Sequence, residues 1–408
     1  MWDKEKLLRR LDMLTGDDRL YFLSYGLFLA TSLLSASFFY KFYEGKACMW
    51  LQVLCIALLV GYECRNGFLK AQQWSAALFL GGMTLIAMVP AIGSQTRMVA
   101  MMFPYIYCAR RIPFAKIARF TLKYSLILAF FVVISGYLGI IDNVVMMKAG
   151  RVREFLGFRY ALYLPGILLN LTALWVWFYK DKIPVWGALV WAAVNWIVYY
   201  MTDSRISFFI AEGLLVAALL MSWMPKITHK LRYLWAALIP IFAVCGIGAL
   251  YLTKNYNSNI AWMRRLNSML EGRLNLGSKS LEAYGVKLFG QVIEWVGNGL
   301  ETDGMVVKGE YTYVDCLYIK VLQRYGYVFL ILLLPMLCWA MYRLWKRREY
   351  LAMVICASVA VHCVVDDLSL SLHYNTFWIA MGLAIIAPNM LNWNGQTTQV
   401  LSQEPQTE

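Results

Sequence analysis

Long apolar stretches recur along most of the chain, and they constrain the fold more than any other feature. A bilayer core about 30 Å thick is crossed by about 20 apolar residues in a helix. Hydrophobic residues make up 61% of the 408 residues and charged residues 15%, too few to cover a soluble globule. The sequence therefore predicts an all-α, polytopic integral membrane protein with about twelve transmembrane helices. The predicted spans are residues 21–39, 47–63, 74–90, 93–109, 121–141, 161–179, 184–201, 204–223, 232–252, 313–341, 350–366 and 374–391.

Lysine and arginine in the short loops indicate the orientation, because loops rich in these residues stay on the cytoplasmic side. With the N-terminus inside, the predicted cytoplasmic segments hold dense cationic clusters. We expect a cytoplasmic N-terminal segment (1–20), a transmembrane domain (21–391) and a polar cytoplasmic tail (392–408). The clusters are Lys4, Lys6, Arg9 and Arg10, then Arg110, Arg111, Lys116, Arg119 and Lys123, then Lys226, Lys230 and Arg232, and finally Arg343, Lys346, Arg347 and Arg348.

These topology clusters account for most of the net charge of +14, so we expect no nucleic-acid partner. The nine cysteines are scattered singly without a Cys-x-x-Cys motif, and the chain has three histidines. This pattern favours small core residues over a disulfide framework or a metal centre. We expect neither a metal nor a cofactor.

Two predicted outer segments break the charge rule by carrying several cations, namely residues 142–160 and a large loop at about 253–312. Structureless connections longer than about 15 residues are usually functional or disordered. Trp262, Leu266 and Met269 recur at helical spacing opposite polar residues. The large loop is therefore expected to contain short amphipathic helices, the first of them lying on the outer leaflet.

Within that loop, Gly272 is expected to end the first helix, and residues 278–284 are expected to form a second one. The stretch after Gly290 is rich in turn residues and predicts irregular loop structure.

Seven arginines on the predicted outer face are candidates for binding an anionic substrate group. A guanidinium presents a planar fork of donors that suits phosphate and pyrophosphate oxygens, and it stays charged when partly buried. Simpler roles stay open, namely snorkelling to headgroups, a local ion pair with Asp203, and binding of anionic lipid by the amphipathic helix. The candidates are Arg151, Arg153 and Arg159 in the first segment, Arg205 at a tight turn, and Arg264, Arg265 and Arg273 in the large loop.

Ionisable residues at the ends of the later spans are candidates for catalysis. Asp315 lies at the mouth of the tenth predicted span, and His362 and Asp366 lie around the last outer turn. Any of these three could act as general base for a sugar hydroxyl if burial tunes its pKa. Equally, His362 could be a hydrogen-bonded core histidine, and Asp366 or Asp367 could cap the turn.

The order of short motifs along the chain is similar to that of the Wzy-type polysaccharide polymerases of the O-antigen polymerase and ligase superfamily. The resemblance covers most of the chain from about Ser94 onward. The motifs are an Arg-x-Arg-x-x-x-Gly-Phe run from Arg151 to Phe158, Ser204-Arg205 opening a helix, Arg265-Leu266-Asn267, Glu271-Gly272-Arg273, Tyr284-Gly285, Phe289-Gly290, and Val314-Asp315-x-x-Tyr318 before Gly326.

The resemblance implies polymerisation of undecaprenyl-pyrophosphate-linked oligosaccharide repeat units on the outer face of the bacterial cytoplasmic membrane, in surface polysaccharide biosynthesis. It implies a metal-independent glycosyl transfer, in which arginines stabilise the pyrophosphate leaving group. The partners expected are the lipid-linked oligosaccharide, membrane lipids, a chain-length regulator and a flippase. Both termini of this multi-pass protein would lie in the cytoplasm.

Two other functions stay open. One is an O-antigen ligase-like transfer of finished glycan to another acceptor, which the sequence barely separates from polymerisation. The other is a lipid-linked oligosaccharide flippase or another transporter. A transporter is expected to carry charged residues through its helices, whereas here the polar residues gather in the predicted outer segments.

Overall fold

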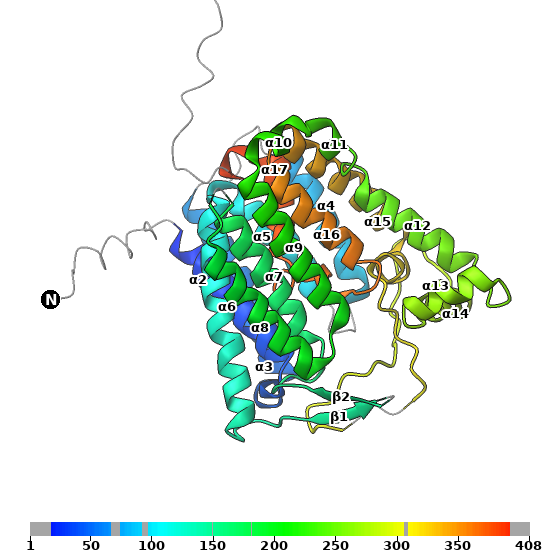
Figure 1. Cartoon of the computed structure of the whole chain (residues 1–408). Helices are drawn as coiled ribbons and strands as arrows, with labels where there is room; N and C mark the ends of the chain where they lie inside the picture. Colours follow the sequence, from blue (N-terminus) through cyan, green and yellow to red (C-terminus); the bar gives the residue numbers. More distant parts are fainter. Residues whose placement is uncertain are drawn as a thin grey trace, which may run out of the picture.

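Apolar helices dominate the fold. The computed structural model describes residues 18–66, 74–91, 97–148, 150–180, 182–305 and 309–391, and it is 72% helical. Figure 1 shows a bundle of long helices from which a short two-helix arm projects on one side. In the first half of the chain the helices are α2 (Arg19–Ser35), η1 (Phe38–Phe42), α3 (Lys46–Arg65), α4 (Trp74–Met88), η3 (Val89–Ala91), α5 (Arg97–Cys108), η4 (Ala109–Arg111), α6 (Phe114–Tyr137), α7 (Tyr163–Phe178) and α8 (Val185–Thr202).

The second half of the chain completes the bundle and forms the arm. Its helices are α9 (Arg205–Trp223), α10 (Pro225–Lys230), α11 (Arg232–Ala236), α12 (Ile241–Lys254), α13 (Ala261–Met269), α14 (Arg273–Tyr284), α15 (Leu317–Lys346), α16 (Tyr350–His362), η5 (Leu368–Leu370), α17 (Phe377–Ile386) and η6 (Pro388–Leu391).

Every predicted apolar window contains a helix, although the window 232–252 is divided before Pro240 into α11 and α12. Five helices are long and apolar enough to cross a membrane, namely α3, α6, α8, α9 and α15, and five shorter ones are also apolar. The count of twelve spans and the orientation of the termini stay predictions. Residues 1–17 of the expected N-terminal segment and the whole expected tail, 392–408, lie outside the described residues.

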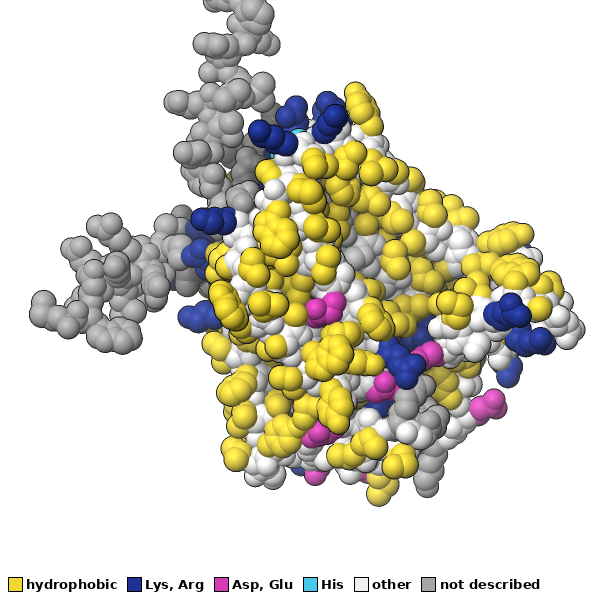
Figure 2. Space-filling model, in the orientation of Figure 1, with side chains coloured by type: hydrophobic (Ala, Val, Ile, Leu, Met, Phe, Trp, Pro, Cys, Tyr) yellow, Lys and Arg dark blue, Asp and Glu magenta, His cyan; other side chains and the backbone are white. Residues whose placement is uncertain are grey.

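The two most enclosed helices, α7 and α17, are apolar on all sides, which suits helices surrounded by others. α7 packs against α6, α8 and α9, and α17 packs against α5 and α15. The face of the molecule in Figure 2 is also rich in hydrophobic side chains, and Trp186 and Tyr200 are 81% and 82% exposed. A surface this rich in exposed apolar side chains is compatible with a membrane protein.

The expectation of an all-α fold is wrong at one place, a β-hairpin at the lower end of the bundle in Figure 1. Strands β1 (Val145–Lys148) and β2 (Arg151–Glu154) pair antiparallel, with Met146 opposite Arg153. The turn contains Gly150 at φ +74°, a conformation that glycine adopts without steric cost. Because β2 contacts α8, the hairpin brings Arg153 close to the turn between α8 and α9.

The arm consists of α13 and α14, which confirms the two short helices expected in the large loop. The second helix begins at Arg273, five residues earlier than expected. Glu271 and Gly272 both have left-handed backbone conformations, with φ of +51° and +87°. These two residues turn the chain sharply, so that Arg273 opens a new helix next to the end of the first.

The long helix α15 is interrupted at Gly326, where φ is +90° and ψ is 175°. The segment around Gly290 fills the interruption, because Gln291 N–H donates to the Arg324 carbonyl and Val328 N–H donates to the Leu288 carbonyl. A Cβ atom at Gly290 would lie 2.0 Å from the Arg324 oxygen, and one at Gly326 would lie 2.4 Å from the Gly290 nitrogen. Only glycine fits at both positions of this contact.

We therefore expect Gly326→Ala and Gly290→Ala each to lower the free energy of unfolding by more than about 2 kcal/mol, from backbone strain together with steric overlap. The control is Gly248→Ala in α12, where a Cβ meets nothing within 4 Å and alanine favours the helix. Thermal unfolding of the purified protein in detergent gives the comparison. Equal melting temperatures for all three variants would contradict the close contact.

Candidate functional site

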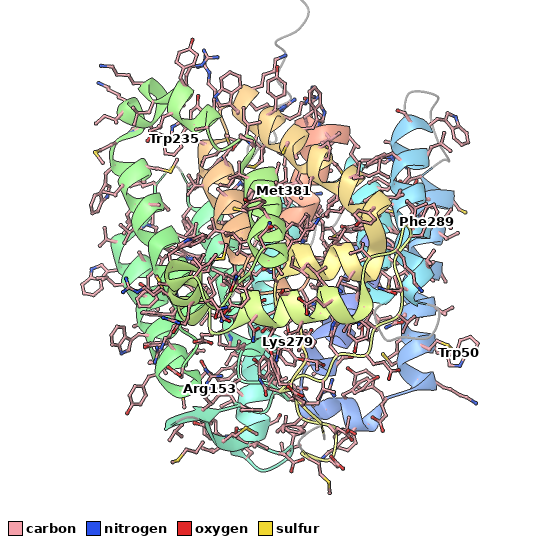
Figure 3. The ribbon with its side chains drawn as sticks, turned by 90° about the vertical axis from the view of Figure 1, so that its right-hand side faces the viewer. Trp50, Arg153, Trp235, Lys279, Phe289 and Met381 are labelled. Atoms are coloured by element: carbon pink, nitrogen blue, oxygen red, sulfur yellow. The ribbon has the colours of Figure 1, made fainter. Side chains whose placement is uncertain are left out.

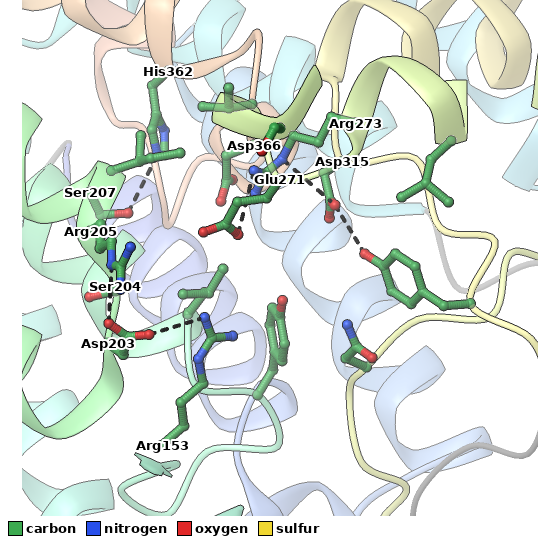
Figure 4. Close-up of a pocket in the computed structure, with 18 residues that line it drawn as sticks. Arg153, Asp203, Ser204, Arg205, Ser207, Glu271, Arg273, Asp315, His362 and Asp366 are labelled. Atoms are coloured by element: carbon green, nitrogen blue, oxygen red, sulfur yellow. Dashed lines mark hydrogen bonds and ion pairs between the residues drawn. The ribbon is translucent and has the colours of Figure 1, made fainter. Parts of the chain in front are cut away.

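A polar cavity of about 450 Å³ lies where the hairpin, the α8–α9 turn, the arm and the ends of α15 and α16 meet. Segments far apart in the sequence contribute its lining. Six predicted site residues lie on its wall, and Figure 4 shows them pointing toward one another. They are Arg153, Arg205, Arg273, Asp315, His362 and Asp366.

Asp203 holds the arginines on the hairpin side of the cavity. It ends α8 in a left-handed conformation with φ of 51°, which aspartate tolerates better than most residues. Its two carboxylate oxygens lie 3.6 Å from Nη2 of Arg153 and 3.3 Å from Nε of Arg205. The local ion pair expected between Asp203 and Arg205 is therefore present, and Arg153 shares it (Figure 4).

Arg273 reaches the cavity from the opposite side, at the start of α14. Its side chain is only 10% exposed. Its ion pairs are long, 3.8 Å from Nε to Asp315 and 3.9 Å from Nη1 to Glu271. Two carboxylates thus surround this guanidinium without a close hydrogen bond to it.

Both arginines have unsatisfied hydrogen-bonding capacity. The Nε atoms of Arg153 and Arg273 are buried and have no hydrogen-bond acceptor among the described residues. Leaving a buried donor unpaired costs about 1–3 kcal/mol, and more for a charged group. The Nε of Arg159, outside the cavity, is unpaired in the same way, so this feature alone does not mark the site. Arg153 and Arg273 differ from Arg159 because both line one cavity, where the oxygens of an anionic ligand would accept from their other N–H groups.

The cavity also contains two carboxyl groups outside the helices with raised pKa values. Burial raises the pKa of Asp315 to about 6, although Arg273 opposes the shift. Burial and the neighbouring charge of Asp367 raise the pKa of Asp366 to about 7. One Asp366 oxygen also accepts from the Leu368 N–H at 2.7 Å, so the expected capping of the turn is present. Both groups can therefore exchange protons near neutral pH.

His362 ends α16 and is buried between two hydroxyl groups. Its Nε2 lies 3.4 Å from the hydroxyl of Ser207, and its Nδ1 lies 3.1 Å from that of Ser369. Both ring nitrogens therefore have partners, as in a hydrogen-bonded core histidine. Ser207 also lines the cavity, so the imidazole can act on a ligand through this hydroxyl.

Three of the other predicted arginines do not line this cavity. Arg159 donates from Nη2 to the Ser35 carbonyl at 2.7 Å and lies over the ring of Tyr40. Arg264 and Arg265 are exposed on α13. The backbone of Arg151 belongs to β2, but its side chain is outside the described part of the structure.

Several residues that line the cavity were not predicted from the sequence. Tyr160 and Tyr311 line the cavity, and the Tyr311 hydroxyl donates to Asp315 at 3.0 Å. Burial and Asp315 raise the pKa of Tyr311 above its usual value, so it stays a donor. No pattern in the sequence marks these tyrosines. Within the described residues, no group of three or more His, Cys, Asp or Glu side chains is arranged to hold a metal ion.

A buried network next to the cavity was also missed. Lys320 forms an ion pair with Asp367 and donates to the Tyr313 hydroxyl, while that hydroxyl donates to Asp367 at 3.0 Å. The network joins the start of α15 to the loop that carries Asp366. An isolated lysine in an apolar window was a usable signal, because charges at such depth are usually paired.

We expect Lys320→Met to destabilise the protein by about 3–5 kcal/mol, because it leaves the Asp367 charge buried without its cation. The double variant Lys320→Met/Asp367→Asn removes both charges and is expected to be more stable than Lys320→Met alone. Denaturation midpoints of the two variants test this, with exposed Lys279→Met as the control. A double variant no more stable than Lys320→Met would contradict the pairing.

The chain matches no protein-family model, no curated protein and no solved structure. The resemblance to the Wzy-type polymerases therefore stays an expectation from short motifs.

Proposed function

We propose that the cavity binds the pyrophosphate of a lipid-linked oligosaccharide and transfers its glycan to a second lipid-linked repeat unit. The protein would then be a polymerase of undecaprenyl-pyrophosphate-linked units on the outer face of the bacterial cytoplasmic membrane. One observation carries the proposal, namely that Arg153 and Arg273 line one cavity from separate elements and that their carboxylate partners lie at 3.6–3.9 Å. A pyrophosphate has enough acceptor oxygens to accept from two guanidinium groups.

In the proposed reaction, the arginines stabilise the pyrophosphate leaving group. The acceptor hydroxyl attacks the anomeric carbon, the bond from that carbon to the pyrophosphate oxygen breaks, and the oxygen keeps the electron pair. Arg153 and Arg273 stabilise the negative charge that develops there. Asp203 holds Arg153 at 3.6 Å, while Asp315 lies 3.8 Å from Arg273, so both cations are already oriented before the donor binds.

Asp366 is the proposed general base that takes the proton of the acceptor hydroxyl. Its pKa of about 7 keeps a substantial ionised fraction at neutral pH while making it a stronger base than an ordinary carboxylate. Asp315 is the proposed positioning partner of Arg273, because its pKa is lower and its oxygen already accepts from Tyr311. His362 would act through Ser207. The proposed chemistry is independent of metals.

Arg273→Ala and Arg153→Ala are each expected to lower the rate of glycan elongation by about 10²-fold or more, because each removes charge stabilisation of the leaving group. The assay uses purified protein in liposomes with a lipid-linked repeat unit, and the products are resolved as a ladder. Lys279→Ala is the matched control, since Lys279 is an exposed cation on the same helix as Arg273. Figure 3 shows α14 with Lys279 across the front of the bundle and Arg153 below it.

The products of this assay also separate the alternatives. Longer lipid-linked glycans support a polymerase. Transfer of glycan only to an added non-polyprenyl acceptor would indicate a ligase, and movement of the lipid across the bilayer without any lengthening would indicate a transporter. Wild-type elongation by both arginine variants would overturn the assignment of the cavity.

The pH profile of elongation tests the base. A raised pKa means that Asp366 is protonated, and so inactive as a base, below about pH 7. We expect kcat/KM to fall about tenfold per pH unit below about pH 6 and to level off above about pH 8. The Asp366→Asn variant is expected to lose most of the activity, and its remaining activity is expected not to fall in this way at low pH. A flat profile between pH 5 and 8 in the wild type would exclude Asp366 as the base.

A further inference from the structure

Ser268 lines the cavity, but most of the surface of α13 lies outside it and combines exposed cations with exposed apolar side chains. Arg264 and Arg265 are exposed, and among the described residues no carboxylate lies within ion-pair distance of either. We propose that α13 is an anchor helix that binds anionic phospholipid headgroups through Arg264 and Arg265. Trp262 and Met269 then lie at the boundary between headgroups and acyl chains.

The arrangement of side chains around α13 supports this role. Met263 is buried and faces the protein, whereas Trp262 and Met269 are 55% and 78% exposed. At about 100° per residue, Trp262 and Met269 lie on the same edge of the helix and Arg265 lies about 60° from Trp262, whereas Arg264 lies on the opposite flank, next to Ser268. A helix edge with an aromatic ring, a long apolar side chain and an adjacent cation is typical of helices that lie in a membrane interface.

Helix α12 also presents exposed apolar side chains. Val244, Ile247 and Tyr251 are exposed at spacings of three and four residues, so they form one stripe along α12 toward the arm. Figure 2 shows hydrophobic side chains along the upper edge of the arm and dark blue cations beside them. A lipid surface would cover both the stripe and the edge of α13.

Charge selects an anionic surface over a neutral one. Residues 254–287 contain six lysines and arginines but only two carboxylates. Each basic side chain close to an anionic leaflet strengthens the attraction by a factor of about five. A soluble phosphate ion would use the two arginines but would leave Trp262 and Met269 exposed to water, so the observations favour a phospholipid.

Hydrogen exchange of the full-length protein in nanodiscs, without any lipid-linked substrate, tests the proposal. We expect residues 260–270 to exchange at least fivefold more slowly in discs containing 30% phosphatidylglycerol than in phosphatidylcholine discs. Arg264→Gln/Arg265→Gln is expected to lose the difference. Arg264→Lys/Arg265→Lys is expected to keep most of it, because headgroup attraction needs charge and not a bidentate fork.

The matched control is Lys226→Gln/Lys230→Gln, which removes two exposed cations from α10 and is expected to leave the exchange of α13 unchanged. Equal exchange of α13 in the two kinds of disc would overturn the proposal, as would protection that persists in the double glutamine variant. Inorganic phosphate added to phosphatidylcholine discs is expected to have no effect. If phosphate alone reproduced the protection, the site would bind a free anion instead of a lipid.

Discussion

Buried positive charge that is only partly compensated is the constraint on which this structure depends. A guanidinium within an apolar helix bundle loses much of its hydration, and the loss is offset only if carboxylates or ligand oxygens replace the water. The carboxylates around Arg153 and Arg273 lie at 3.6–3.9 Å, and the two Nε atoms stay unpaired among the described residues. The fold therefore neutralises these cations with long ion pairs, although Nη1 of Arg273 also donates to the Leu270 carbonyl at 3.3 Å, and this loose pairing favours binding of an anion.

The elements around the cavity position these charged side chains. The hairpin directs Arg153 toward α8, and the left-handed Asp203 places a carboxylate between two guanidinium groups. Glu271 and Gly272 start α14 where Arg273 can reach Asp315. Lys320 and Asp367 then fix the start of α15 to the loop that carries Asp366. Each of these local features lowers the stability of the fold when taken alone, through backbone strain or through burial of charge. Each of them also helps to form the cavity.

Hydropathy predicted the helices, and the charge pattern predicted six of the residues that line the cavity, but neither could tell which arginines share a cavity. Arg265 and Arg273 are similar in sequence context, yet only Arg273 follows the left-handed pair that redirects the chain. Arg159 looked equivalent to Arg153, but tertiary contacts place it against the Ser35 carbonyl. The hairpin was missed because the four-residue strands carry too short a pattern. Which side chains point into the cavity, and which partners they have, depends on contacts between segments far apart in the sequence. Local sequence patterns do not reveal such contacts.

The two carboxyl groups give the cavity a charge that depends on its ligand. An anion bound between Arg153 and Arg273 would raise the pKa of both Asp315 and Asp366, because like charges disfavour ionisation. On the proposed function, donor binding thus makes Asp366 a stronger base while reducing the fraction that is ionised at a given pH. Arg273 counters the second effect, since it lowers the pKa of both groups. The same guanidinium that is proposed to stabilise the leaving group therefore also helps to keep the proposed base ionised.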